Sequence, residues 1–242
     1  MSYIFREHIK QSLAVIVFLI TLTACTSESY DAGDGPNSYL TADLVLLHTS
    51  QDKSVRSALL DDGTTLQFSN PFAQDWLTRP DSVYRALLYY DKTVAASDAA
   101  ASNPTATSIV RARSVRPVSV LRPVEAEDMK TLRTDPVGFE SLWLSKNKSY
   151  INLSLLLKSG KTEADDAMHA LGIVSHGTTT DADRRRTLHL TLYHDQGGVP
   201  AYYTVQQYVS IPTQLLEEAD TVELTLNTYN GKKVVKVAVS NL

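Results

Sequence analysis

Cys25 is the only cysteine of the 242-residue chain and the residue with the clearest chemistry. It follows Leu22 and two small residues, the order that a lipoprotein signal peptidase cleaves before the cysteine thiol is acylated. A short basic head and the apolar run 13–22 come first, and that run is too short to span a bilayer as a helix. We therefore predict that residues 1–24 are a lipoprotein signal peptide and that Cys25 is lipidated.

An acylated N-terminus would place the rest of the chain outside the cytoplasm, on the outer membrane at its periplasmic face or at the cell surface. Residues 25–38 contain almost nothing to bury and are expected to form a flexible tether. With no second cysteine the chain forms no internal disulfide, so its stability must come from packing. The formal net charge of −4 gives no general attraction to nucleic acid or anionic lipid, and we expect no nucleic-acid partner.

Arginines and tyrosines supply the candidate interaction surface. Arg111, Arg113 and Arg116 recur along one predicted strand, and Tyr202 and Tyr203 adjoin at the start of another. Arginine and tyrosine side chains both supply a large contact area with a polar handle. The alternatives are a solvated sheet edge for the arginines and packing in the core or on a sheet face for the tyrosines.

Motifs for catalysis and for cofactor binding are absent from the sequence, including His-Glu-x-x-His, Gly-x-Ser-x-Gly and a phosphate loop. Histidines 169 and 176, and histidines 189 and 194, are spaced by odd numbers, which places each pair on opposite faces of a strand. The acid pairs fall in predicted turns or helix ends, where solvation explains them: Asp61-Asp62, Asp165-Asp166 and Glu217-Glu218. We expect no catalytic residue, no cofactor and no metal; a hydrolase with an unrecognised site is the alternative.

The first half of the folded part shows alternation of apolar and polar residues typical of strands. Asp61-Asp62-Gly63 has the residues of a tight hairpin turn, and Pro117 should keep its strand at a sheet edge or bend it. Five short strands with a first hairpin are typical of a small closed barrel such as the OB-fold. We predict an OB-like barrel over residues 39–122, with strands at 40–46, 55–60, 64–68, 83–90 and 109–121 and a low-complexity loop at 95–104.

The second half continues the all-β pattern, and a linker at 123–137 with a short helix at 125–133 should precede it. Leu188, Leu190 and Leu192 are expected to face a core, and Asn230-Gly231 is typical of a type I′ hairpin turn. Pro212 should begin one or two helical turns. We predict a β-sandwich over residues 138–242, with strands at 141–144, 150–157, 168–175, 186–193, 201–209, 221–229 and 232–239.

The order of several short motifs resembles one known family. After the cysteine motif come Asp61-Asp62-Gly63-Thr64, Val115-Arg116-Pro117-Val118, Asp135-Pro136-Val137-Gly138 running into Leu142-Trp143-Leu144, Tyr150-Ile151-Asn152-Leu153 and the closing hairpin. In this order they resemble the NigD-like lipoproteins of Bacteroidetes. The resemblance implies an N-terminal OB-type domain, a C-terminal β-sandwich and, for the founding member, a link to bacteriocin immunity. It brings no catalytic residues.

The expected protein is therefore a membrane-anchored, extracytoplasmic and non-enzymatic interaction protein of the immunity type. Its partner would be a protein or a glycan of the cell envelope. A glycan-binding surface lipoprotein is the alternative function. The acids Glu28, Asp31 and Asp34 in the tether resemble the signal that sends lipoproteins of Bacteroidetes-type bacteria to the cell surface.

Overall fold

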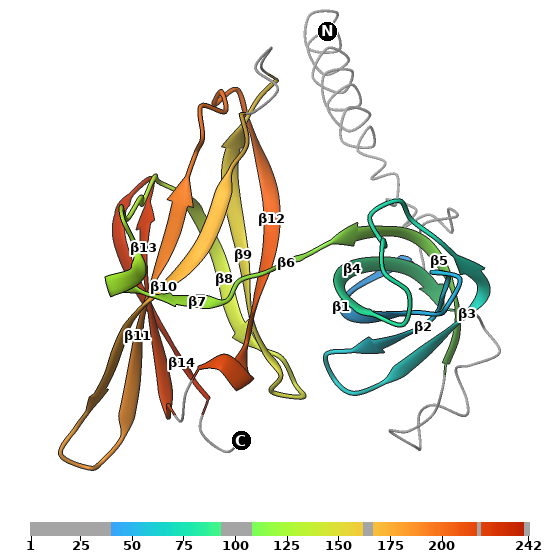
Figure 1. Ribbon diagram of the computed structural model, residues 1–242, viewed down its shortest axis with the longest axis horizontal. Helices are drawn as coiled ribbons and strands as arrows, with labels where there is room; N and C mark the ends of the chain where they lie inside the picture. The colour runs from blue at the N-terminus through green and yellow to red at the C-terminus, as the bar shows by residue number, and fades with distance from the viewer. Residues whose placement is uncertain (1–39, 93–107, 162–166, 217–218, 240–242) are drawn as a thin grey trace, which may run out of the picture. The chain divides into compact units, whose positions relative to one another are not determined.

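The computed structural model describes residues 40–92, 108–161, 167–216 and 219–239, and β-strands are the dominant secondary structure in them (Figure 1). The predicted signal peptide, Cys25, the tether and the loop 95–104 lie outside the described residues, as do the acid pairs 165–166 and 217–218. Within the described ranges, no helix has the length and apolar character needed to cross a membrane.

Five strands of the first half close into a barrel, in the order β1-β2-β3-β5-β4 with β4 returning to β1 (Figure 1). Only β3 and β5 pair in parallel; the other four pairings are antiparallel. The closed barrel and its strand order confirm the predicted OB-like fold. The strands are β1 (Leu40–Thr49), β2 (Val55–Leu60), β3 (Thr65–Phe72), β4 (Val83–Lys92) and β5 (Ser108–Pro117).

Strand alternation fills the barrel interior. Val45, Leu47 and Leu88 are fully buried there. At Leu44 and Val45 β1 is buried on both faces, because Leu44 packs on the outer face of the barrel in a second cluster with Leu87 and Val118. Trp143 and Tyr208 of the sandwich pack against this second cluster, so the barrel wall contributes to the contact with the second half of the chain.

The second half forms two sheets, with strand orders β14-β13-β11-β10-β7 and β6-β12-β9-β8 (Figure 1). In β11 every second residue, including Leu188, Leu190 and Leu192, is buried as predicted. The strands are β6 (Ser119–Val120), β7 (Pro123–Glu125), β8 (Gly138–Leu144), β9 (Tyr150–Ser159), β10 (Ala170–Thr180), β11 (Arg186–Asp195), β12 (Tyr203–Pro212), β13 (Thr221–Thr228) and β14 (Gly231–Ala238), with 3-10 helices at Ala126–Asp128 and Thr213–Leu215.

The segment that follows the barrel differs from the expectation of a barrel end at 122 and a linker at 123–137. β6 pairs with β12 and β7 pairs with β10, so residues 119–125 already belong to the two sheets of the sandwich. Leu121 is buried in the sandwich core, and its burial places residues 119–125 in the sandwich. The helix expected at 125–133 is only one 3-10 turn, because the Arg133 carbonyl accepts from His194 N–H and the segment pairs with β11 instead.

The two predicted hairpins are present, but one turn differs in type. Gly63 has a φ of +89° in the β2–β3 turn, as its Asp-Gly sequence indicates. In the β13–β14 turn only Gly231, with a φ of +101°, has a positive value, whereas a type I′ turn needs one at Asn230 as well. The Thr228 hydroxyl accepts from Asn230 N–H and donates to the Gly231 carbonyl, which fixes a different turn.

Arg85 of β4 is a buried charge that joins the barrel to the sandwich. Its side chain is 1% exposed, and its Nη1 and Nη2 donate to the two carboxylate oxygens of Asp61 at 2.6 and 2.7 Å. Nη2 also donates to Asn152 Oδ1 at 3.0 Å, and Nε donates to Ser210 Oγ at 3.1 Å. The guanidinium carbon lies 4.3 Å from the ring centroid of Tyr150. Four of the five N–H groups of the buried cation thus donate hydrogen bonds.

This network corrects the interpretation of Asp61-Asp62 as a solvated pair. Asp62 is exposed and accepts the turn hydrogen bond from Thr64 N–H at 2.9 Å, as expected of a turn residue. Asp61 instead faces Arg85 and also accepts from Asn152 Nδ2 at 2.9 Å. Solvation explains Asp62 alone, whereas Asp61 neutralises a buried guanidinium.

We expect Asp61→Ala to lower the free energy of unfolding by about 3–5 kcal/mol, because it leaves the buried guanidinium of Arg85 without its counter-charge. Asp62→Ala is the matched control and should cost about 1 kcal/mol or less, since it removes one exposed hydrogen bond. Urea unfolding followed by circular dichroism measures both. Equal losses in the two variants would show that the Arg85 network contributes no more than the turn.

Candidate functional site

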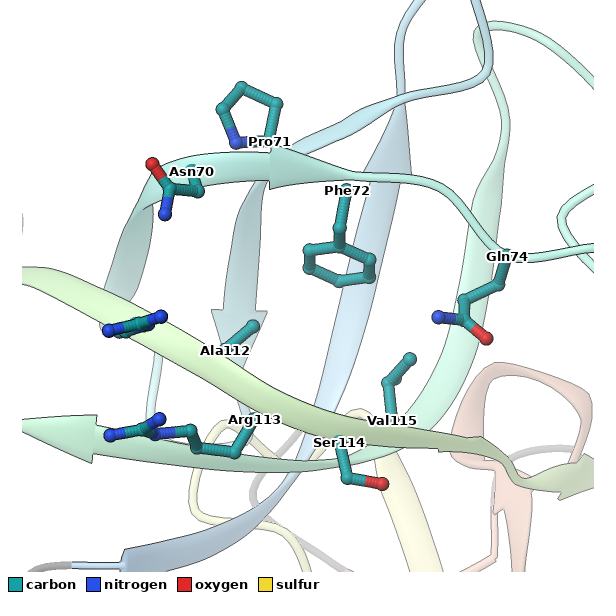
Figure 2. A pocket seen from close by; sticks show the side chains of 9 residues that line it. Asn70, Pro71, Phe72, Gln74, Ala112, Arg113, Ser114 and Val115 are labelled. Carbon is teal, nitrogen blue, oxygen red and sulfur yellow. The ribbon is translucent and has the colours of Figure 1, made fainter. Parts of the chain in front are cut away.

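A groove opens in the barrel wall between the end of β3 and the middle of β5 (Figure 2). It encloses about 220 Å³. Residues 70–72 and Gln74 line one side, and the consecutive residues 111–115 line the other. The groove therefore contains two of the five residues that the sequence singled out, Arg111 and Arg113.

The groove exists because β3 and β5 pair over a short distance only. Their register covers residues 66–68 of β3 and 108–110 of β5. After this short pairing β3 bulges. Gln67 pairs with Ser57 of β2, and Phe72 pairs with Val55. The four residues 68–71 of β3 therefore lie opposite a single residue of β2. Pro71 lies in this bulge, where its missing N–H costs no ladder hydrogen bond. β3 therefore separates from β5 directly after their paired residues, and the groove opens between the two strands.

A second bulge lies in β5 beside the groove. The register between β4 and β5 shifts at Tyr89 and Tyr90, where Arg113 is the extra residue of β5. The extra residue changes the alternation of faces further along β5. Arg111 and Arg113, two residues apart, are both exposed and both line the groove. β5 lies between β3 and β4 only at residues 108–110, and at Pro117 it pairs with β4 alone, which agrees with the sheet-edge position expected for that proline.

The two arginines differ in their electrostatic partners. Arg113 forms an ion pair with Asp91, whose side chain is 18% exposed. Arg111 is exposed and has no ion-pair partner within the described part of the chain. Since no acidic residue is among those that line the groove, one positive charge remains uncompensated there.

An aromatic ring and two amides complete the groove. Figure 2 shows the Phe72 ring reaching from β3 into the space above β5, with Asn70 toward the end where Arg113 lies and Gln74 toward the other end. The ring is packed against Phe68, with centroids 5.1 Å apart, so it is a fixed part of the wall. A free guanidinium, two amides and an apolar face together suit a ligand that carries a carboxylate next to an apolar group.

The other sequence candidates lie elsewhere. Arg116 is exposed on β5 but does not line the groove. Tyr202 and Tyr203 adjoin the start of β12 in the sandwich, with 79% and 51% of their surface exposed. The alternative that these two rings pack in the core is therefore wrong.

Sequence reasoning missed the opposite wall of the groove. Asn70 and Pro71 read as a simple turn, and Phe72 and Gln74 carried no signal of their own. A proline next to asparagine inside a β-rich stretch does indicate a bulge or strand end. That signal could have located the place where β3 departs, although not the strand that faces it.

Residues 120–239 match the family model of the NigD-like C-terminal β-sandwich domain. The chain carries a NigD-like sandwich domain. This confirms the resemblance that the sequence motifs indicated, and the matched residues begin within β6, where the structure also begins the sandwich.

Solved structures share the fold of the whole described chain. A NigD-like immunity protein from Bacteroides caccae ATCC 43185 is 22% identical with a TM-score of 0.58, covering 81% of this chain and 91% of that chain. A protein of unknown function from Bacteroides vulgatus ATCC 8482 is 16% identical with a TM-score of 0.59, covering 82% and 90%. Among curated proteins, none matches the chain. At these identities the likeness shows the fold alone.

Two histidines of the NigD-like domain contact each other although the sequence placed them in different pairs. His169 Nδ1 lies 3.0 Å from His194 Nε2, and the rings stack with centroids 5.2 Å apart. His194 is fully buried, and its Nδ1 lies 3.0 Å from the carbonyl oxygen of Asp135. Because a carbonyl only accepts, His194 carries its proton on Nδ1, and its Nε2 accepts from His169. No group of three or more His, Cys, Asp or Glu residues suited to a metal occurs in the described ranges.

Burial lowers the pKa of His169 below its usual 6.5, the neighbouring His194 lowers it further, and the Lys158 carbonyl opposes both. A histidine with a depressed pKa binds its proton more readily in the unfolded chain. The folded state therefore loses stability as the pH falls through the usual value, and the loss levels off once the pH lies below the depressed value.

We expect the urea midpoint of unfolding to fall more between about pH 7.5 and about pH 5.5 in the wild type than in His169→Gln, which removes the titrating group. His176→Gln is the control, because His176 is exposed. Matched urea titrations at the two pH values give the comparison. An equal pH dependence in the wild type and in His169→Gln would contradict the assignment.

Proposed function

We propose that the protein is a lipid-anchored binding protein of the cell envelope, held by acylated Cys25, that captures a protein partner through the groove beside Arg111. The observation that carries the proposal is an exposed guanidinium without an ion-pair partner in the described ranges, at the rim of a preformed groove. An exposed arginine without an internal ion pair is available to another molecule. The proposed role is immunity-like, which the name of the similar NigD-like immunity protein from Bacteroides caccae supports.

Binding fits the groove better than catalysis does. Ser114 is the only hydroxyl among the lining residues, and none of those residues is a histidine, aspartate or glutamate that could take its proton. Nucleophilic catalysis needs such a base within hydrogen-bond reach. The groove chemistry therefore supports recognition of an anionic group.

Glycan binding through the sandwich is the second candidate. The exposed rings of Tyr202 and Tyr203 favour it, since aromatic faces provide stacking surfaces for sugars. Binding of an envelope glycan that is lost in a Tyr202→Ser, Tyr203→Ser double variant, but kept when the groove arginines are removed, would choose this candidate over the first.

We expect the double variant Arg111→Ala, Arg113→Ala to retain its partner from solubilised envelope at least about tenfold less well than the wild type, a loss of about 1.4 kcal/mol. Arg116→Ala is the matched control, because Arg116 is exposed on the same strand outside the groove. Retention on the immobilised mature chain, with thermal unfolding measured alongside, gives the comparison. Equal retention by all three proteins would refute the groove as the binding site.

We expect Cys25→Ser to abolish recovery of the protein in the lipid fraction, because the acyl chains alone would hold the mature chain to the membrane. Metabolic labelling with an alkyne fatty acid should mark the wild type and leave the serine variant unlabelled. Label on the serine variant would show that another residue is acylated.

A further inference from the structure

The groove is bordered by a strand edge that the barrel leaves unused. β5 pairs with β4 from Val110 to Pro117, but with β3 only up to Val110. Residues 111–115 therefore have no ladder partner on the β3 side, although β5 lies inside a closed barrel. Such an edge offers main-chain donors and acceptors to another extended chain.

Resting on the function proposed above, we infer that the groove takes an extended acidic peptide segment of the protein partner, which adds as a strand to the free edge of β5. Its main chain bonds to residues 111–115, a stretch about 13 Å long at the usual rise of a strand. A glycan has no repeating N–H and C=O groups with which to continue a β-ladder, so the free edge favours a peptide.

Charge and shape define the sequence of that peptide. Side chains of an added strand alternate between its two faces. On the outer face they meet Arg111, which has no carboxylate partner in the described residues, and Arg113, which Asp91 already holds in place. On the inner face they meet Ala112 and the Phe72 ring. The fitting pattern is an acidic residue at every second position with apolar residues between them.

The arrangement favours a bidentate carboxylate contact at Arg111. Its guanidinium needs no reorganisation, since no internal ion pair has to break when a ligand binds. The small side chain of Ala112 leaves space beside the Phe72 ring, which is half-buried and packed on Phe68. The wall of the groove is thus preformed, which limits the cost of ordering on binding.

The test uses the full mature chain without its lipid and four synthetic peptides measured by titration calorimetry. The first alternates glutamate and valine, and the second has glutamine in place of glutamate. The third and fourth have the sequence of the first with every second main-chain amide N-methylated, in one phase or in the other. We expect the first to bind, the second to bind at least about tenfold more weakly, and N-methylation in the phase that faces β5 to abolish binding. Arg111→Ala should weaken the first peptide about tenfold, and Arg116→Ala should leave it unchanged.

The outcomes separate this inference from the proposed function. If both N-methylated peptides bind as well as the parent, the ligand is held through its carboxylates and strand addition is wrong. If polygalacturonate binds in an Arg111-dependent manner and the peptides do not, the groove takes an acidic glycan and the inference is overturned. If partner capture depends on Arg111 and no peptide binds, the inference fails while the proposed function stands. If neither depends on Arg111, both fail.

Discussion

A closed barrel needs every neighbouring pair of strands to be joined, and the shortest of these pairings here is the set of three residue pairs between β3 and β5. The short closure has two consequences. It permits β3 to bulge away at residues 68–71, and it leaves residues 111–115 of β5 with one free edge. Barrels normally remove strand edges altogether. This one keeps a short edge and flanks it with Arg111 and Arg113, whose charges also protect the edge against pairing with another copy of itself.

The barrel is held to the NigD-like sandwich by a different kind of interaction. The outer face of β4 carries Arg85, which the barrel alone satisfies only through Asp61. Its remaining bonds go to Asn152 and Ser210, both fully buried in the sandwich. A buried guanidinium without these partners costs several kcal/mol, so it strongly favours the arrangement that supplies them. Arg85 and the groove arginines thus have opposite roles. Arg85 is buried and its hydrogen bonds join the barrel to the sandwich, whereas the groove arginines remain exposed to solvent.

Local sequence patterns predicted the features that depend on neighbouring residues. Alternation located the strands, Gly63 and Gly231 marked the hairpins, and exposed positions on β5 identified Arg111 and Arg113. Such patterns cannot predict contacts between residues that are distant in the sequence. Asp61 is 24 residues from Arg85, and Asn152 is 67 residues from Arg85. The same holds for His169 and His194, which are 25 residues apart and meet only because β11 pairs with β10. The groove was missed for this reason, since Phe72 and Gln74 face β5 only after the barrel closes.

We propose the free edge of β5 as the place where this protein binds its partner. Amide hydrogen exchange, measured residue by residue with and without the captured partner, tests it most directly. The account predicts slower exchange at residues 111–115 in the complex, with little change at residues 86–90 of β4, whose pairing is complete on both sides. Unchanged exchange at residues 111–115 in a saturated complex would contradict the account.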